Sequence, residues 1–295
     1  MTEKLTSKTH TGHFPIGFRR GWSNWQNDIQ SLITWAHENQ FAFLDLGSDA
    51  EQYVAIPEET MMKIGSVDLP YWNQLISANP ETRKEAVEKA SRYIETCSTS
   101  LANLFFVVML PEDPSLERKK NFSFMLESFQ ELVPVLEANN SSVVIEGWPG
   151  LGSLCCTPET FRTLFKEISS KSLGINYDPS HLIRMGIDPL RFLNEFSERV
   201  YHVHAKDTEI LHENLYEYGH ELPAAFKPPI DFGEWSWRYT IPGKGITDWK
   251  EVFSLLNQKN YKGLVSIELE DSDYNNSSDA EKEGLLSSLK FLTAS

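Results

Sequence analysis

The sequence predicts an α/β fold, a single (β/α)8 TIM barrel, on three observations. Eight segments of strand character alternate with segments whose apolar residues recur at helical spacing, which is typical of a parallel barrel. The chain has 295 residues, and about 250 residues is typical of one such barrel. No low-complexity segment or composition shift marks a linker. We therefore expect one domain over residues 1–295, with a polar N-terminal tail at about 1–13 and a long loop at about 208–246.

The predicted strands are short and mostly apolar. The run from Leu104 to Leu110 is apolar throughout, as expected of a strand that is covered on both faces. The eight predicted strands span residues 14–18, 41–47, 63–70, 104–110, 142–149, 173–181, 199–207 and 263–271.

The predicted helices begin at residues that favour a helix N-terminus. Ser23, Thr157 and Asp188 are expected N-caps. Thr247 opens the helix before the last strand, and Pro134 interrupts or kinks the longest helix. The predicted helices span residues 25–40, 57–62, 80–97, 115–138, 157–168, 188–198, 247–258 and 278–295.

The composition indicates an acidic globular protein of enzyme size. The apolar fraction is 40% and the charged fraction is 23%, and both are near the averages of globular proteins. The formal net charge of −15 repels phosphodiester backbones and removes the counterion release that drives nucleic-acid binding. A nucleic acid is therefore not expected as a partner.

Membrane segments and disulfides are not expected either. No apolar run approaches the roughly 18 residues that a membrane helix needs, and the polar start lacks a hydrophobic signal core. The three cysteines, Cys97, Cys155 and Cys156, are odd in number and lack metal-type spacing, which favours reduced thiols. We expect a cytoplasmic protein.

Four consecutive strands each end with a residue of a metal-ligand type. These residues are Glu146, Asp178, His204 and Glu268. The carboxyl ends of barrel strands meet at one face, where the chemistry of such barrels is found. Three carboxylates cannot all stay ionised in a low-dielectric site without a cation, so one divalent metal is predicted. Mixed carboxylate and imidazole ligands suit Mn²⁺, Co²⁺, Mg²⁺ or Zn²⁺, and we place Mn²⁺ first because oxygen atoms dominate the set.

The strand that spans residues 199–207 carries three polar side chains on one face. His202, His204 and Lys206 alternate with apolar residues, so they point to the same side. His204 is the expected ligand at the barrel mouth, and His202 lies one layer deeper in a supporting role. Lys206, at the rim, either stabilises negative charge that develops on a substrate or pairs with Glu270.

Three further residues are candidates for substrate binding. Asp45 would reach the barrel mouth from the second strand. Trp148 shares a strand face with Glu146 and could line an apolar wall for a sugar ring, as could the tryptophans of the long loop. Arg238 suits a substrate carboxylate, phosphate or pair of hydroxyls. The glycines of the segment 242–245 fit a phosphate-binding turn or an ordinary tight turn.

Five segments resemble those of the xylose-isomerase-like TIM barrels, a group of sugar phosphate isomerases and epimerases that also includes abasic-site endonucleases. They are IEGWPG, NYDPSHLIRMGIDP, RVYHVHAKD, RYTIPGKGITDW and GLVSIELED, and the resemblance is dense from about Ser142 to Asp271. It implies that Glu146, Asp178, His204 and Glu268 bind one catalytic metal. It also implies that His181 lies at the substrate or as an outer ligand.

The resemblance further implies that two glutamates carry the chemistry. In the ketose epimerases of this group the counterparts of Glu146 and Glu268 remove and return a proton next to a carbonyl, on opposite faces of the sugar. This chain departs from those epimerases at two positions. Gly152 replaces a further carboxylate, and Ile210 replaces an arginine, which leaves a simple 3-epimerase assignment open.

The leading hypothesis is a metal-dependent isomerase or epimerase of a small carbohydrate, sugar phosphate or cyclitol, which works through an enediolate next to a metal-bound carbonyl. The first alternative is a lyase, a dehydratase or an enzyme that cleaves keto-glycosides with the same site. The more distant alternatives are an abasic-site endonuclease and a non-catalytic sugar-binding barrel. Whether the chain forms a homo-oligomer is left open.

Overall fold

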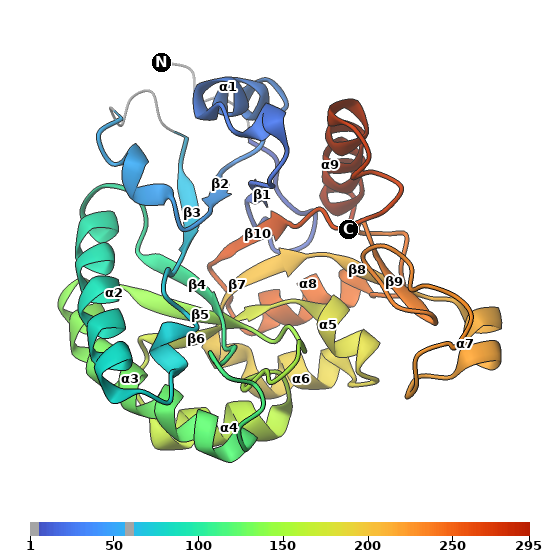
Figure 1. Cartoon of the computed structure of the whole chain (residues 1–295). Helices are drawn as coiled ribbons and strands as arrows, with labels where there is room; N and C mark the ends of the chain where they lie inside the picture. The colour runs from blue at the N-terminus through green and yellow to red at the C-terminus, as the bar shows by residue number, and fades with distance from the viewer. Residues whose placement is uncertain (1–5, 57–61) are drawn as a thin grey trace. The chain divides into compact units, whose positions relative to one another are not determined.

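The computed structural model describes residues 6–56 and 62–295 and is drawn in Figure 1. Its strands are β1 (Ile16–Arg19), β2 (Leu44–Leu46), β3 (Ile64–Asp68), β4 (Leu104–Val108), β5 (Ser142–Glu146), β6 (Leu173–Tyr177), β7 (Val200–Ala205), β8 (Asp207–Ile210), β9 (Trp237–Thr240) and β10 (Leu264–Ile267). Its helices are α1 (Ile29–Glu38), α2 (Pro80–Ser100), α3 (Arg118–Ala138), α4 (Pro158–Glu167), α5 (Pro179–Arg184), α6 (Pro189–Phe196), α7 (His212–Tyr218), α8 (Trp249–Gln258) and α9 (Ser278–Thr293).

The fold class is confirmed as a (β/α)8 barrel. Eight strands close into a barrel in the order β1-β10-β7-β6-β5-β4-β3-β2, while β8 and β9 form a separate antiparallel pair. None of the described helices is long and apolar enough to cross a membrane.

The described chain divides into two compact units. The first unit contains residues 6–43, 178–197 and 203–295, and the second contains residues 44–56, 62–177 and 198–202. In the first unit β1 runs parallel to β10, with Ile16 opposite Val265 and Phe18 opposite Ile267. All four of these side chains are fully buried, which explains why apolar residues alternate along both strands.

The second unit contains the parallel run from β2 to β6. Phe106 of β4 lies opposite Val144 of β5, and Glu146 at the end of β5 lies opposite Asn176 of β6. The three middle residues of β4 and Val143–Ile145 of β5 are buried, as their continuous apolar character predicts, and Glu146 is buried as well. The register brings Glu146 of β5 and Asn176 of β6 to the same level of the sheet.

Helix starts agree with the predictions at some caps and differ at others. Thr157 caps α4 and forms a capping box with Thr160, and Asp188 caps α6. Two predicted caps are wrong, because an aspartate close by accepts the helix amides instead. Asp28 caps α1 where Ser23 was expected, and Asp248 caps α8 where Thr247 was expected.

Several predicted boundaries also change. Strand β6 ends at Tyr177, because Asp178 caps α5 and Pro179 occupies its first turn, so His181 lies on a helix and not on the strand. Pro134 lies within α3, which continues from Arg118 to Ala138. The predicted loop at 208–246 contains most of β8 and all of α7 and β9. The predicted helix at 57–62 falls almost entirely outside the described residues.

The described part of the predicted N-terminal tail is hydrogen-bonded. The amide of Ser7 donates to the carbonyl of Gln40 at 2.8 Å, and the amide of Thr11 donates to the carbonyl of Ser295 at 3.1 Å. Thr9 is buried. Residues 7–11 therefore contact the residue that follows the C-cap of α1 and the last residue of the chain.

Candidate metal centre and adjacent pocket

Three predicted metal ligands of the first unit converge. Asp178 follows β6, His204 lies on β7 and Glu268 follows β10. Asp178, His181 and Glu268 each offer a ligand atom, and these atoms lie within 4.8 Å of one another. His204 Nδ1 lies 3.4 Å from Glu268 Oε2, and His181 Nε2 lies 3.3 Å from Asp178 Oδ2. A buried group of carboxylates and imidazoles is the donor set that a divalent ion requires.

Lys206 lies among these carboxylates. Its Nζ is 2.6 Å from Glu268 Oε2, 2.8 Å from Glu270 Oε2 and 3.4 Å from Asp178 Oδ2. The Lys206 side chain is 1% exposed, and its predicted pairing with Glu270 is present. The ammonium neutralises part of the negative charge that the carboxylates bring into a buried place.

A second cation, Arg19 at the end of β1, also faces Glu268. Its Nε lies 3.4 Å from Glu268 Oε1. Burial by itself raises the pKa of the Glu268 carboxyl, but the positive charges of Lys206, His204 and Arg19 hold that pKa well below its ordinary value. Glu268 is therefore a carboxylate at neutral pH, which both a metal ligand and a proton acceptor must be.

The second unit holds the other predicted site residues. Glu146 is the last residue of β5, and Asn176 Nδ2 donates to its Oε1 at 2.9 Å. Asp45 Oδ2 lies 2.8 Å from His202 Nε2, and both side chains are fully buried. His202 thus has the supporting position that was predicted for it. For Asp45 the structure gives a pairing with histidine, and its contact with substrate stays a prediction.

Trp148 and Arg238 have defined surroundings too. Trp148 is half-buried, and its indole covers Gly150 so closely that a Cβ there would lie 1.8 Å from the ring. Arg238 Nε donates to Glu209 at 2.8 Å and its Nη1 donates to Asp273 at 3.0 Å. The binding of substrate by either residue stays a prediction.

The glycine-rich segment 242–245 is a tight turn around an aspartate. The buried Asp207 carboxylate accepts the amides of Gly243 and Thr247 at 3.1 and 3.0 Å. A Cβ on Gly245 would lie 2.2 Å from Asp207 Oδ1. The Asp207 carboxylate therefore occupies backbone amides of this turn, which we considered from the sequence as a phosphate-binding site.

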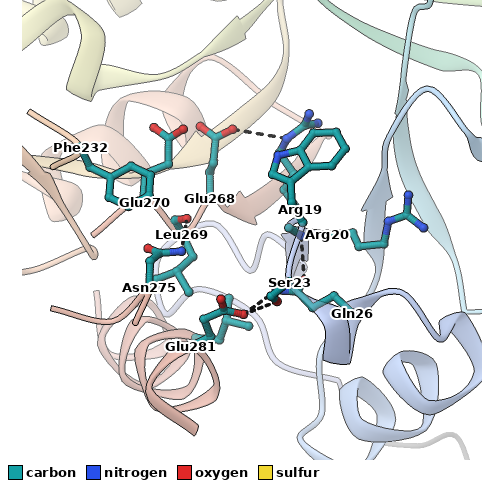
Figure 2. Close-up of a pocket in the computed structure, with 13 residues that line it drawn as sticks. Arg19, Arg20, Ser23, Gln26, Phe232, Glu268, Leu269, Glu270, Asn275 and Glu281 are labelled. Atoms are coloured by element: carbon teal, nitrogen blue, oxygen red, sulfur yellow. Dashed lines mark hydrogen bonds and ion pairs between the residues drawn. The ribbon is translucent and has the colours of Figure 1, made fainter. Parts of the chain in front are cut away.

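A pocket of about 250 Å³ opens beside Glu268 in the first unit. Figure 2 shows the carboxylates of Glu268 and Glu270 side by side at this pocket, with Arg19 opposite. Two exposed aromatic side chains also line it, Trp22 at 79% and Phe232 at 41% exposure. Charged groups beside aromatic faces suit a polyol, whose hydroxyls need hydrogen bonds and whose C–H faces pack on rings.

One wall of this pocket is fixed by Glu281 of α9. Its Oε2 accepts hydrogen bonds from Ser23 Oγ at 2.6 Å and Gln26 Nε2 at 3.0 Å (Figure 2). It also accepts one from Trp25 Nε1 at 2.5 Å. The Gln26 side chain in turn accepts from the amide of Gly21 at 2.7 Å. The turn that follows β1 is thereby tied to α9.

Sequence reasoning missed Arg19 and Glu281. Arg19 directly follows the predicted first strand, so the end-of-strand rule that selected Glu146 would also have selected Arg19. Glu281 carries no such signal, because it lies on a helix in a segment with several other acidic residues.

The family model described as "Xylose isomerase-like TIM barrel" matches residues 31–295. The chain belongs to this family. Its solved relatives include the E. coli 3-keto-D-glucoside 4-epimerase YcjR in apo form, with a TM-score of 0.70, 16% identity, and coverage of 95% of this chain and 98% of that one. A D-tagatose 3-epimerase-like protein has a TM-score of 0.65 at 22% identity, over 94% of this chain and 98% of its own. At such identities the likeness shows the fold alone.

Curated relatives match part of the chain. The inosose dehydratase of Geobacillus thermodenitrificans (strain NG80-2) is 28% identical over 164 residues, which are 54% of this chain and 52% of that protein. The uncharacterized protein YfiH of Bacillus subtilis (strain 168) is 36% identical over 120 residues, 40% of this chain and 37% of its own length. The matches thus span between about a third and a half of these relatives. Several of these curated relatives are named inosose dehydratases.

Proposed function

We propose that the chain is a divalent-metal-dependent isomerase or epimerase of a small carbohydrate or cyclitol, which moves a proton on the carbon next to a carbonyl. The observation that carries this proposal is the convergence of Asp178, His204 and Glu268 beside a pocket lined by charged and aromatic groups. The epimerases and dehydratases among the relatives support the same class of chemistry.

The charge balance of the first unit supports a metal. Three carboxylates, Asp178, Glu268 and Glu270, face the two cations Lys206 and Arg19, which leaves one negative charge. Glu146, at the carboxyl end of β5, would add a second, because the carboxyl ends of barrel strands face one end of the fold. We propose Glu146, Asp178, His204 and Glu268 as the ligands, with Mn²⁺ ahead of Co²⁺, Mg²⁺ and Zn²⁺.

The protein groups have distinct tasks in this proposal. Glu268, kept ionised by Lys206 and Arg19, accepts the proton from the substrate carbon, and Glu146 returns a proton from the other face. Asn176 fixes Glu146 through its 2.9 Å hydrogen bond. A bound metal would act as a Lewis acid that polarises the substrate carbonyl.

Dehydration is the second candidate, because inosose dehydratases of several bacteria match about a third to a half of this chain. Removal of the same proton would then expel a hydroxyl from the neighbouring carbon. Glu268 would keep its task as proton acceptor, and a second group would protonate the leaving hydroxyl.

Incubation in D₂O separates these outcomes. The metal-loaded protein is mixed with ketoses, 3-keto-glucosides and inososes, and products are followed by NMR and mass spectrometry. Deuterium on the carbon next to the carbonyl without loss of water supports the isomerase or epimerase. Loss of water supports the dehydratase, and loss of an aglycone supports cleavage of keto-glycosides. If no substrate exchanges and chelation changes nothing, the proposal of a metal-dependent enzyme fails.

We also propose a cytoplasmic location. The thiols of Cys97, Cys155 and Cys156 are free and buried, as is usual in reducing compartments. An antibody against the chain, applied to fractionated cells, would detect it with soluble cytoplasmic markers if this is correct.

A further inference from the structure

Tyr239 of β9 lies between two groups of α5. Its hydroxyl is 2.6 Å from His181 Nδ1 and 2.6 Å from Arg184 Nη1. The Tyr239 side chain is 3% exposed, so water does not compete for these contacts. Strand β9 belongs to the separate antiparallel pair, so this contact comes from the predicted long loop at 208–246.

The Arg184 guanidinium is held in place by aromatic rings. Its Cζ lies 4.4 Å from the ring centroid of Trp237 and 5.7 Å from that of Tyr239. Lys206 Nζ lies 4.5 Å from the Tyr239 ring. Such contacts between cations and rings stabilise both charges in a place with little water. Trp237, one of the long-loop tryptophans considered for a sugar-binding wall, therefore packs against Arg184.

The hydrogen-bond roles follow from the donors and acceptors. A guanidinium has only donors, so Arg184 donates to the Tyr239 oxygen. Within residues 6–56 and 62–295, the Tyr239 hydroxyl has polar contacts with Arg184 and His181 alone. The hydroxyl proton therefore has a single acceptor, His181 Nδ1. Burial raises the pKa of Tyr239, so the phenol keeps this proton at neutral pH.

A histidine that accepts at Nδ1 carries its proton on Nε2. That nitrogen is the one that lies 3.3 Å from Asp178 Oδ2. We propose that Tyr239 and Arg184 are positioning residues that fix His181 as the Nε2–H tautomer. His181 then donates a hydrogen bond to Asp178 or to a substrate oxygen, and it is not a metal ligand.

The alternative is the Nδ1–H tautomer of His181. If Nδ1 carried the proton, it would donate to the Tyr239 oxygen, and the hydroxyl proton would then have no acceptor among these two neighbours. A buried donor without an acceptor is unfavourable, because it loses its hydrogen bonds to water and gains none. Only in that arrangement would the lone pair of Nε2 point toward the carboxylates and a metal.

The tautomer of His181 is measured by two-bond ¹H–¹⁵N correlation spectra of the full chain labelled with ¹⁵N-histidine and treated with a chelator. The His181 signals are assigned by their loss in His181→Gln. We expect the pattern of a neutral Nε2–H imidazole in the wild type. In Tyr239→Phe, which keeps the ring, we expect the ¹⁵N resonance of Nδ1 to move downfield, because its lone pair loses the hydrogen bond from the hydroxyl. The pattern of Nδ1–H in the wild type, or no change in Tyr239→Phe, would overturn the inference.

Tyr261→Phe is the matched control. Its buried hydroxyl donates to the carbonyl of Leu264 at 2.8 Å in the same unit. The loss of that hydroxyl should leave the His181 spectrum unchanged. A His181 spectrum altered equally by Tyr261→Phe would mean that general loosening, and not the lost hydrogen bond, causes the effect.

Titration with Mn²⁺ by calorimetry tests the role of His181 independently. We expect His181→Gln and Tyr239→Phe to bind Mn²⁺ within about threefold of the wild type, while kcat/KM of Tyr239→Phe falls about 10–100-fold. A fall of more than tenfold in Mn²⁺ affinity for either variant would make His181 a ligand and refute the inference. The role toward substrate rests on the proposed function, whereas the tautomer does not. Absence of Mn²⁺ binding by the wild type would count against the proposed function and leave the spectra to decide the tautomer.

Discussion

Replacement of Lys206 by methionine removes the cation that three carboxylates share. The ammonium lies 2.6 Å from Glu268, 2.8 Å from Glu270 and 3.4 Å from Asp178, and its side chain is 1% exposed. Loss of one member of a buried ionic network typically costs 3–5 kcal/mol, because the remaining charges stay buried and uncompensated. Since 1 kcal/mol corresponds to about 2–4 °C in a chain of this size class, we expect the apo protein to melt about 6–20 °C lower.

The pH dependence of this loss has a defined sign. The pKa of Glu268 in the folded chain lies below its ordinary value of 4.5. Its contribution to stability is therefore present above pH 4.5 and is lost as the pH falls through the folded-state pKa. Lys206→Met removes the main group that lowers this pKa, so the difference from the wild type should be largest at pH 7 and should shrink as the pH falls below 4.5 toward the folded-state pKa of Glu268.

The assay is urea unfolding of the chelated proteins at pH 7 and at a series of lower pH values that extends below pH 4, followed by addition of Mn²⁺. The metal should restore part of the lost stability at pH 7, because it supplies positive charge to the same carboxylates. Lys244→Met is the control, since Lys244 bonds Tyr274 at 2.8 Å on the surface and should change stability by less than about 1 kcal/mol. A loss below about 1 kcal/mol for Lys206→Met, or one independent of pH, would refute the reasoning.

Three further substitutions test other parts of the structure. Asn176→Ala removes the amide that donates a hydrogen bond to Glu146. Mn²⁺ affinity measured by calorimetry should fall about tenfold. An unchanged affinity would mean that the Asn176–Glu146 pair takes no part in metal binding. Glu281→Ala leaves three hydrogen-bond donors without their shared acceptor. The free energy of unfolding in urea should therefore fall by about 3 kcal/mol. A fall below about 1 kcal/mol would contradict these three hydrogen bonds. Gly245→Ala brings a methyl group to 2.2 Å from the Asp207 carboxylate. The free energy of unfolding should fall by at least about 2 kcal/mol in the same assay. An unchanged free energy of unfolding would mean that Gly245 does not lie against Asp207.

The barrel and its carboxyl-end residues were predictable because both depend on local patterns. Alternation along a strand determines that Glu146 and His204 differ from their apolar neighbours, and the barrel brings strand ends to one face. The helical position of His181 was not predicted. Asp178 followed by Pro179 carries the same helix-start signal as Asp188 followed by Pro189, so the sequence offered the evidence that the predicted strand ends before Asp178.

The contacts that define the environment of the site depend on distant parts of the chain. Lys206 and Glu268 are separated by 62 residues, and Glu281 and Trp25 by 256. Such pairs have no periodicity in the sequence, because tertiary packing alone selects them from many acidic and basic residues. The contacts of Tyr239 are also between distant parts of the chain. They depend on the packing of β9 against α5, which no pattern in the predicted loop at 208–246 indicates.

The measurement that most directly tests the central claim is Mn²⁺ titration by calorimetry of the chelated wild type and of His204→Ala, whose imidazole lies 3.4 Å from Glu268. A divalent metal held by Asp178, His204 and Glu268 predicts one Mn²⁺ per wild-type chain and at least a hundredfold weaker binding to the variant. Equal binding by the two proteins, or no binding by a folded wild type, would contradict it.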